Sequence, residues 1–230
     1  APGHGNGWEP YPLSLRIVNW IKWHTGGNPL GVRALDSLAV QVRYLAGRLE
    51  YHLLGNHLLA NAKALVMAGL FFCGPEADLW RHRGLRILRR EIDAQILDDG
   101  GHFERSPMYH ALVLEDILDL LNLADSTPAA VPAHTRDDWS DAAGHMRSWL
   151  AAMSHPDGGI AFFNDAAFGI APSLAELDAY AQRLGLSPCV PHSARLLVLV
   201  GSGYVRATCP AAMVLIDAGP VGPDHLPGHA

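Results

Sequence analysis

The stretch GNHLLANAKALVMAGLFF, at residues 55–72, decides the fold of this chain. From His57 to Phe72, apolar side chains occupy nearly every face of a helical wheel, which is typical of an inner helix that is covered on both sides. Gly74 and Pro75 follow and end the helix. Because an inner helix needs neighbours on both sides, the sequence predicts a mostly helical protein built around this segment.

Helical periodicity also extends outward from this segment in both directions. It predicts further helices at residues 13–23, 30–54, 76–97, 107–123, 137–153 and 173–184. Ser106-Pro107 predicts a helix start, and Ser173 with Glu176 predicts a capping box. Short turns between successive helices favour antiparallel helical hairpins, either as a superhelix or closed into an α/α toroid. We find no fixed repeat period.

The pattern changes after Pro191. Residues 196–200, 204–208 and 213–217 are short, β-branched and separated by Gly or Pro, which predicts consecutive strands of an antiparallel sheet. We therefore expect a helical domain at residues 1–190 and the first strands of a β domain at 191–230. Three strands leave an unpaired edge, so we expect the β domain to be truncated at Ala230.

Composition excludes some classes of protein. Hydrophobic residues make up 49% of the 230 residues and charged residues 17%, as in a globular protein, and the net charge of −6 gives no reason to bind nucleic acid. No apolar stretch is long enough for a membrane span, and no signal peptide is visible. We expect the three cysteines to be small buried hydrophobic residues.

Two segments carry polar residues that a core does not require. Asn56 and His57 open the apolar helix, where Asn56 is also a good N-cap. Glu104, Tyr109 and His110 follow a Gly-Gly turn, and titratable clusters on loops are often functional. A first-turn tyrosine is equally compatible with plain packing.

Three other segments are less specific. His155-Pro156-Asp157-Gly158-Gly159 is a good turn that needs no function. His225 and His229 lie four apart, but Pro227 and Gly228 prevent the helix that a metal pair at that spacing requires, so we predict no metal site. Arg83, Arg86 and Arg90 share a helix face that is most simply a solvated surface.

Taken together, these segments resemble the heparinase II/III-like and alginate-lyase-like polysaccharide lyases. The motifs that carry the resemblance occur in the family's order, and they are Gly55-Asn56-His57, residues 99–110, residues 155–159 and Gly228-His229-Ala230. The last of these resembles the start of a G-H-x-H-x-D segment, whose second histidine would lie beyond Ala230. Some members of the family bind zinc through that second histidine, so the departure removes support for a metal site in this chain and for activity of the truncated chain.

The resemblance implies an incomplete α/α toroid followed by an antiparallel β-sandwich. It also implies β-elimination on a polysaccharide that contains uronic acid, with no cofactor, and it favours a periplasmic or secreted location. Asn56 and His57 match the pair that neutralises the sugar carboxylate, and Tyr109 and His229 match the catalytic tyrosine and histidine. We expect Glu104, Arg105 and His110 to bind substrate.

Tyr109 acts as a base or an acid in this mechanism if nearby cations lower its pKa. Two other functions remain open. One is a non-catalytic module that binds acidic carbohydrate, with Trp8, Trp20 and Trp23 as stacking platforms, although core packing is the commoner use of tryptophan. The other is a glycoside hydrolase on the same toroid, for which Glu104 and Asp165 are the candidate carboxylate pair.

Overall fold

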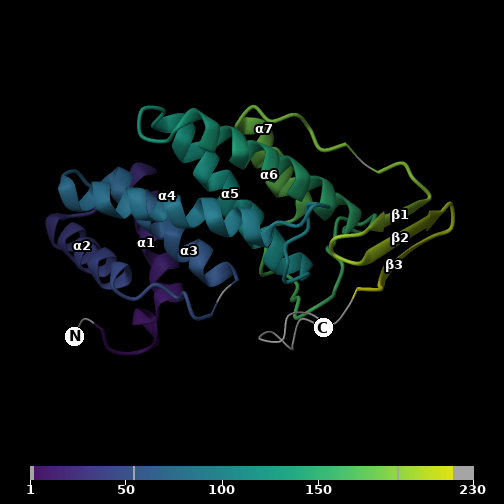
Figure 1. The fold of residues 1–230 in the computed structure, drawn as a ribbon, viewed down its shortest axis with the longest axis horizontal. Helices are drawn as coiled ribbons and strands as arrows, with labels where there is room; N and C mark the ends of the chain where they lie inside the picture. Colours follow the sequence, from purple (N-terminus) through teal and green to yellow (C-terminus); the bar gives the residue numbers. More distant parts are fainter. Residues whose placement is uncertain (1–2, 54, 191, 220–230) are drawn as a thin grey trace. The chain divides into compact units, whose positions relative to one another are not determined.

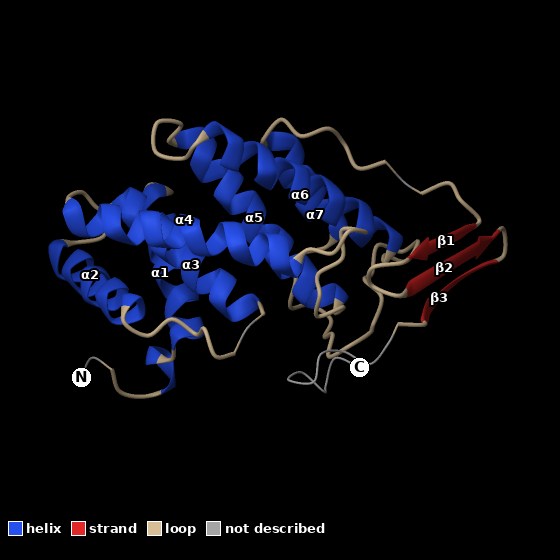
Figure 2. Cartoon of the chain, in the orientation of Figure 1, coloured by secondary structure: helices blue, strands red, loops and turns tan. Residues whose placement is uncertain are grey.

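The structure is a computed structural model, and it describes residues 3–53, 55–190 and 192–219. In this part of the chain there are seven α-helices, one 3-10 turn at Asn6–Trp8 and three β-strands (Figures 1 and 2). The chain divides into two compact units, Ala1–Asp93 and Ala94–Ala230. The mostly helical fold with an antiparallel sheet, which the sequence predicts, is confirmed.

The first unit contains α1 (Pro10–Thr25), α2 (Val32–Ala46), α3 (Asn56–Phe71) and most of α4 (Pro75–Gln95). The inner position of α3 is confirmed, because α1 and α2 both pack against it and nearly all of its side chains are buried. Leu58, Leu59 and Leu65 are wholly inaccessible to solvent. Burial of these apolar side chains stabilises the unit.

Two glycines allow α3 and α4 to cross closely. A Cβ added at Gly69 would lie 2.6 Å from the Ala77 carbonyl oxygen, and one added at Gly84 would lie 2.7 Å from that of Ala62. Real Cβ atoms do not approach backbone so closely, so the crossing requires glycine on both helices. Neither glycine has the left-handed backbone conformation. The lack of room for a side chain is therefore what requires glycine at both positions.

The helix expected at residues 30–54 is shorter than the sequence predicts. It ends at Ala46, and Gly47 begins a turn that leads into α3. The Glu50 amide donates to the Asn61 side chain, 3.0 Å away, instead of to a helical carbonyl. Leu53, which the predicted helix includes, lies outside α2 and is 44% exposed.

The second unit contains α5 (Pro107–Ser126), α6 (Ala133–Ala152) and α7 (Leu174–Arg183), which pack against one another. The predicted capping box is confirmed, because Ser173 and Glu176 bond reciprocally at the start of α7. Ser106 stands at the N-cap position of α5 as expected, but its hydroxyl makes no capping bond.

The three predicted strands form one antiparallel sheet in the order β1 (Leu196–Leu199), β2 (Tyr204–Cys209) and β3 (Ala212–Asp217). Tyr204 pairs with Leu199 on one side and Asp217 on the other. Its ring is fully buried in a cluster with Trp149 and Leu199, which fixes the sheet to the end of α6. The expected β-sandwich, and the boundary at residue 190, stay predictions.

One turn occurs twice in the second unit, although the sequence shows no fixed repeat. Leu97–Gly101 follows α4, and His155–Gly159 follows α6. In each turn the first amide donates to the carbonyl of the second glycine, and an aspartate accepts from that glycine's amide. An isolated antiparallel bridge closes each turn. The shared Asp-Gly-Gly sequence accounts for both.

The prediction that all three cysteines are buried is wrong. Cys73 and Cys209 are exposed, and only Cys189 is partly covered. Cys73 follows the end of α3, and Cys209 ends β2, so each lies where the chain leaves the packed core. The general preference of cysteine for the interior therefore does not hold at these ends of a helix and a strand.

Candidate functional site

Asn56 and His57 occupy the first two helical positions of α3. The N-cap residue is Gly55, whose φ of 71° lies in the left-handed region that favours glycine. The expectation that Asn56 is the N-cap is therefore wrong by one position. As the first helical residue Asn56 is 8% exposed, so its side chain lies largely inside the protein.

His57 is held between a ring and a carboxylate. The Tyr11 ring stacks on the imidazole, with centroids 4.4 Å apart and planes 22° apart. On the ring edge, Nδ1 lies 3.2 Å from Oε1 of Glu50. The imidazole side chain is 38% exposed, whereas that of Glu50 is only 7% exposed. His57 thus combines a fixed orientation with access from outside.

Asn61 connects these groups from one turn further along α3. Its Oδ1 accepts from the Glu50 amide at 3.0 Å, and its Nδ2 donates to Glu50 Oε2 at 3.1 Å and to Ser14 Oγ at 3.0 Å. Ser14 donates in turn to the Pro10 carbonyl. The sequence analysis did not single out Glu50 as a site residue. The presence of Asn61 four residues after His57, and so on the same helix face, is the only signal in the sequence that points to this network.

The second group of candidate residues begins at the turn Leu97–Gly101. The Asp99 carboxylate accepts from Ser202, from its amide at 2.7 Å and its hydroxyl at 2.8 Å, which ties the turn to the β1–β2 connection. Gly100 has φ of 86°, and a Cβ there would collide with the His145 carbonyl. Both features fix the start of the segment that leads to Tyr109.

Arg105 lies where this segment turns into α5. Its φ of 57° is in the left-handed region, which is strained for a side chain of this size. Its carbonyl accepts from the Tyr204 hydroxyl at 2.8 Å and from Asn164 Nδ2 at 3.3 Å. These bonds hold the strained backbone, and Pro107 then opens α5. Glu104, predicted to bind substrate, is 4% exposed.

Tyr109 is half-buried in the first turn of α5, and its hydroxyl donates to Asp165 Oδ2 over 3.5 Å. Burial raises the pKa of Tyr109, and the negative charges of Asp165 and Glu104 raise it further. The sequence-based mechanism expects cations that lower this pKa, and the structure has the opposite arrangement. Tyr109 is therefore a neutral phenol, the form that can give up a proton.

His110 is fully buried, and both of its nitrogens are used inside the chain. Nδ1 accepts from the His102 amide at 3.1 Å, Nε2 donates to the Met146 carbonyl at 2.9 Å, and the ring packs on Trp149. Burial lowers the pKa of His110 to about 4. The predicted substrate contact is not tested by these bonds, but they give His110 a structural role at the base of the Tyr109 turn.

The loop that carries Asp165 is also built in an unusual way. Asn164 and Asp165 both have positive φ, 51° and 59°, a conformation that Asn and Asp tolerate better than most residues. Asn164 Nδ2 donates to the Tyr204 hydroxyl at 2.8 Å. Phe162 and Phe168 stack on each other at 4.8 Å while both remain exposed. The loop is otherwise mostly apolar, so Asn164 and Asp165 are its polar residues.

Two of the remaining expectations concern residues that the structure does not connect. His229, the expected catalytic histidine, lies outside the described residues. Asn56 and His57 belong to the first unit, whereas Tyr109 belongs to the second. Their convergence at one site stays a prediction.

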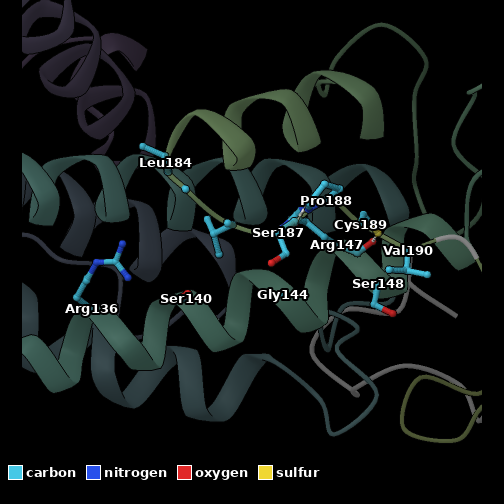
Figure 3. Close-up of a pocket in the computed structure, with 12 residues that line it drawn as sticks. Arg136, Ser140, Gly144, Arg147, Ser148, Leu184, Ser187, Pro188, Cys189 and Val190 are labelled. Carbon is cyan, nitrogen blue, oxygen red and sulfur yellow. Dashed lines mark hydrogen bonds between the residues drawn. The ribbon is translucent and has the colours of Figure 1, made fainter.

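A cavity of about 510 Å³ in the second unit lies between α6 and residues 184–190 (Figure 3). Two arginines line it. Arg136 pairs with Asp125, and the buried Arg147 pairs with Asp178 and donates to the Ser187 carbonyl. Both arginines therefore have carboxylate partners within the chain. Of the predicted site residues that the structure describes, none lines this cavity.

Within the described part of the chain, no helix has the length and apolar character that crossing a membrane requires. Trp23 is 60% exposed, whereas Trp8 is partly buried and contacts Tyr44 edge-on.

Comparison with known proteins adds independent information. The family model of the heparinase II/III N-terminus matches residues 32–182. A heparin-sulfate lyase of Bacteroides stercoris is 43% identical over 76 residues, which are 33% of this chain and 11% of that protein. A heparin-sulfate lyase of Pedobacter heparinus is 37% identical over 87 residues, 36% of this chain and 13% of that protein. The chain thus matches only a small part of these relatives.

Solved structures show the same fold over nearly the whole chain. A crystal structure of heparinase III matches with a TM-score of 0.72 and 21% identity, and it covers 94% of this chain and 38% of that one. A heparan sulfate lyase HepC mutant from Pedobacter heparinus matches with a TM-score of 0.67 and 22% identity, and it covers 95% and 37% of the two chains. Because the family model covers well over half of the residues, the chain belongs to the heparinase II/III N-terminus family.

Proposed function

We propose that this chain is the helical part of a polysaccharide lyase, and that the whole protein cleaves a uronic-acid polysaccharide of the heparan sulfate type by β-elimination. The observation that carries the proposal is the family match over residues 32–182, which includes Asn56, His57 and Tyr109. The heparin-sulfate lyase relatives support the substrate class, because their names specify a sulfated glycan that contains uronic acid.

The reaction requires three contributions from the protein. A base removes the proton on carbon five of the uronate, the bond from carbon four to the glycosidic oxygen breaks, and a double bond forms between carbons four and five. The departing oxygen takes up a proton, so no water is consumed. Because the first step places charge next to a carboxylate, donors must neutralise that carboxylate.

Asn56 and His57 supply these donors in the proposal. An amide and an imidazole at the N-terminal end of α3 sit where the helix dipole also favours a negative ligand. His57 is accessible and oriented by Tyr11 and Glu50. Glu104 and Arg105 bind substrate next to Tyr109, and His229 completes the set as the partner base.

In this mechanism Tyr109 acts as the acid. Its raised pKa means that the free site holds a neutral phenol, which protonates the departing glycosidic oxygen. His229 takes the proton from carbon five, and before the next cycle His229 loses this proton and the tyrosinate regains one. The carboxylate of Asp165 opposes the tyrosinate state, so Asp165 favours the acid role.

The experiment compares two tyrosine variants in the full-length protein that carries this chain. Tyr109→Phe removes the proton donor, whereas Tyr180→Phe removes a phenol that also donates to a carboxylate, Asp119 at 3.1 Å, but from α7. We expect unsaturated uronate, measured by its ultraviolet absorbance, from the wild type and Tyr180→Phe. Tyr109→Phe should lose turnover by a factor of about 10² to 10⁴, the range for general acid–base groups.

The outcomes separate the possible functions. Full turnover by Tyr109→Phe removes this residue from the mechanism. New reducing ends without unsaturation indicate a hydrolase that uses Glu104 and Asp165. Binding of heparan sulfate with neither product indicates a carbohydrate-binding module, and both of these results contradict the lyase proposal.

A further inference from the structure

The network around Glu50 in the first unit has a fixed direction. A backbone amide can only donate, so the Glu50 N–H at 3.0 Å identifies the Asn61 oxygen as the atom that faces it. The Asn61 nitrogen therefore faces Ser14 Oγ and Glu50 Oε2, and it donates to both. Oε2 must be an acceptor for this arrangement to hold. The orientation of each group thus follows from the one before it.

The other carboxylate oxygen then determines the state of the imidazole. An ionised carboxylate only accepts, so Nδ1 of His57 must carry a hydrogen to bond with Oε1 at 3.2 Å. In the neutral ring the hydrogen on Nδ1 leaves Nε2 with a lone pair. The stacked Tyr11 ring restricts rotation of the imidazole. Nε2 is the nitrogen left for a ligand.

We propose that Glu50 is a positioning residue, which accepts Nδ1–H of His57 and so leaves Nε2 as the nitrogen that faces the sugar acid and donates to it once the ring has taken up a second proton. The proposal rests on the proposed function, because it assigns a role to Glu50 in that reaction. Glu50 acts through His57 and touches no substrate. When His57 is protonated, its Nε2–H donates to the uronate carboxylate while Nδ1–H donates to Glu50, so each nitrogen faces one negative group.

The burial of Glu50 explains why a carboxylate is needed here. Its side chain is 7% exposed, and a buried charge is costly unless it has hydrogen-bond partners. Glu50 has two, the Asn61 amide and the His57 ring. At a buried position that serves packing alone, an apolar side chain is often as good or better. The buried charge therefore points to a task at His57.

Glu50→Gln tests the direction of the network. Because Asn61 still donates to the Oε2 position, the glutamine must place its oxygen there and its NH₂ group opposite Nδ1. A donor opposite Nδ1 requires a lone pair on that atom. The variant should therefore change neutral His57 from the Nδ1–H to the Nε2–H tautomer with little change in shape.

The measurement is long-range ¹H–¹⁵N correlation spectroscopy of the 230-residue chain with ¹⁵N-labelled histidine, at a pH where the imidazole is neutral. His57→Gln identifies the signals of residue 57 by their loss. Glu76→Gln is the control, because it removes an exposed carboxylate of the same unit that pairs with Arg43. We expect Nδ1–H in the wild type and Glu76→Gln, and Nε2–H in Glu50→Gln. A wild-type His57 with Nε2–H overturns the proposal without any variant.

Kinetics of the full-length protein then test the role in the reaction. Glu50→Gln should lower kcat/KM for heparan sulfate by roughly 10- to 100-fold, the usual effect of groups that orient a site histidine. Glu50→Asp keeps the carboxylate and should recover part of the loss with the Nδ1–H tautomer. Unchanged kcat/KM in Glu50→Gln overturns the positioning role. If the wild type yields no unsaturated product, the lyase function fails, whereas the tautomer result still decides the geometry.

Discussion

Acid should destabilise the second unit through His110. The folded state favours the neutral ring, because Nδ1 accepts from the His102 amide. A proton on Nδ1 would place that N–H opposite the His102 N–H, so two donors would face each other. Burial lowers the pKa of His110 to about 4, whereas an unfolded histidine titrates near 6.5. The unfolded state therefore binds more protons than the folded state between these values, and the free energy of unfolding falls as the pH drops through that window.

The two pKa values give the size of the effect. On acidification from about pH 7.5 to about pH 5, linkage removes about 2 kcal/mol of the free energy of unfolding. Above pH 6.5 this contribution is complete, and it is lost progressively toward pH 4. The loss is large, because a domain of this size has a total stability of roughly 5–15 kcal/mol.

The assay is urea unfolding of the 230-residue chain at both pH values, with two variants. His110→Gln cannot titrate in this range, yet its amide can still donate to the Met146 carbonyl as Nε2 does. His134→Gln removes an exposed histidine of α6 and serves as the control. The wild type and the control should lose about 2 kcal/mol more than His110→Gln. Equal losses in all three proteins, or a His110 ring that titrates near 6.5 by NMR, would refute the reasoning.

Three further outcomes follow from the second unit. Asp165→Asn should lower the pKa of Tyr109 toward its ordinary value, because one of the charges that raise it is removed; an NMR titration of the phenol that shows no change would contradict this. Gly158→Ala, where nothing lies near a new Cβ, should cost about 1 kcal/mol of backbone strain, whereas Gly100→Ala should cost clearly more because it also collides with the His145 carbonyl. Equal urea midpoints would argue against that collision. Asp99→Asn should destabilise the unit by about 1.5–3 kcal/mol, since the Ser202 amide and hydroxyl lose a charged acceptor, and unchanged thermal unfolding would show that these bonds contribute little.

Periodicity and local signals were enough to predict most of the fold. The inner helix α3 follows from apolar side chains on all faces, and the start of α7 follows from Ser173 and Glu176. The sequence places the end of α2 too late, because both Gly47 and Gly55 are possible helix stops and the prediction uses Gly55. Gly47 is the C-cap of the helix, and three residues later the Glu50 amide donates to Asn61, a tertiary partner that no local pattern reports.

The candidate site was predictable only as far as its motifs. Tyr109 after Ser106-Pro107 has the expected position in the first turn of α5. The direction of its pKa shift depends on Asp165, which is 56 residues away in the chain and reaches Tyr109 only after folding. Glu50 likewise became a candidate only because its carboxylate bonds to His57 and Asn61 in the folded chain. Charges that come together through tertiary packing leave no periodic trace in a sequence.

The bonds between Asp99 and Ser202 have a mechanical consequence. They join the turn before α5 to the β1–β2 connection, and the Tyr204 hydroxyl adds a second link to the Arg105 carbonyl. Two links between the same pair of segments suppress rotation as well as translation. The start of α5, which carries Tyr109, is therefore attached to the sheet at two points. A tilt of the strands would displace the phenol as well.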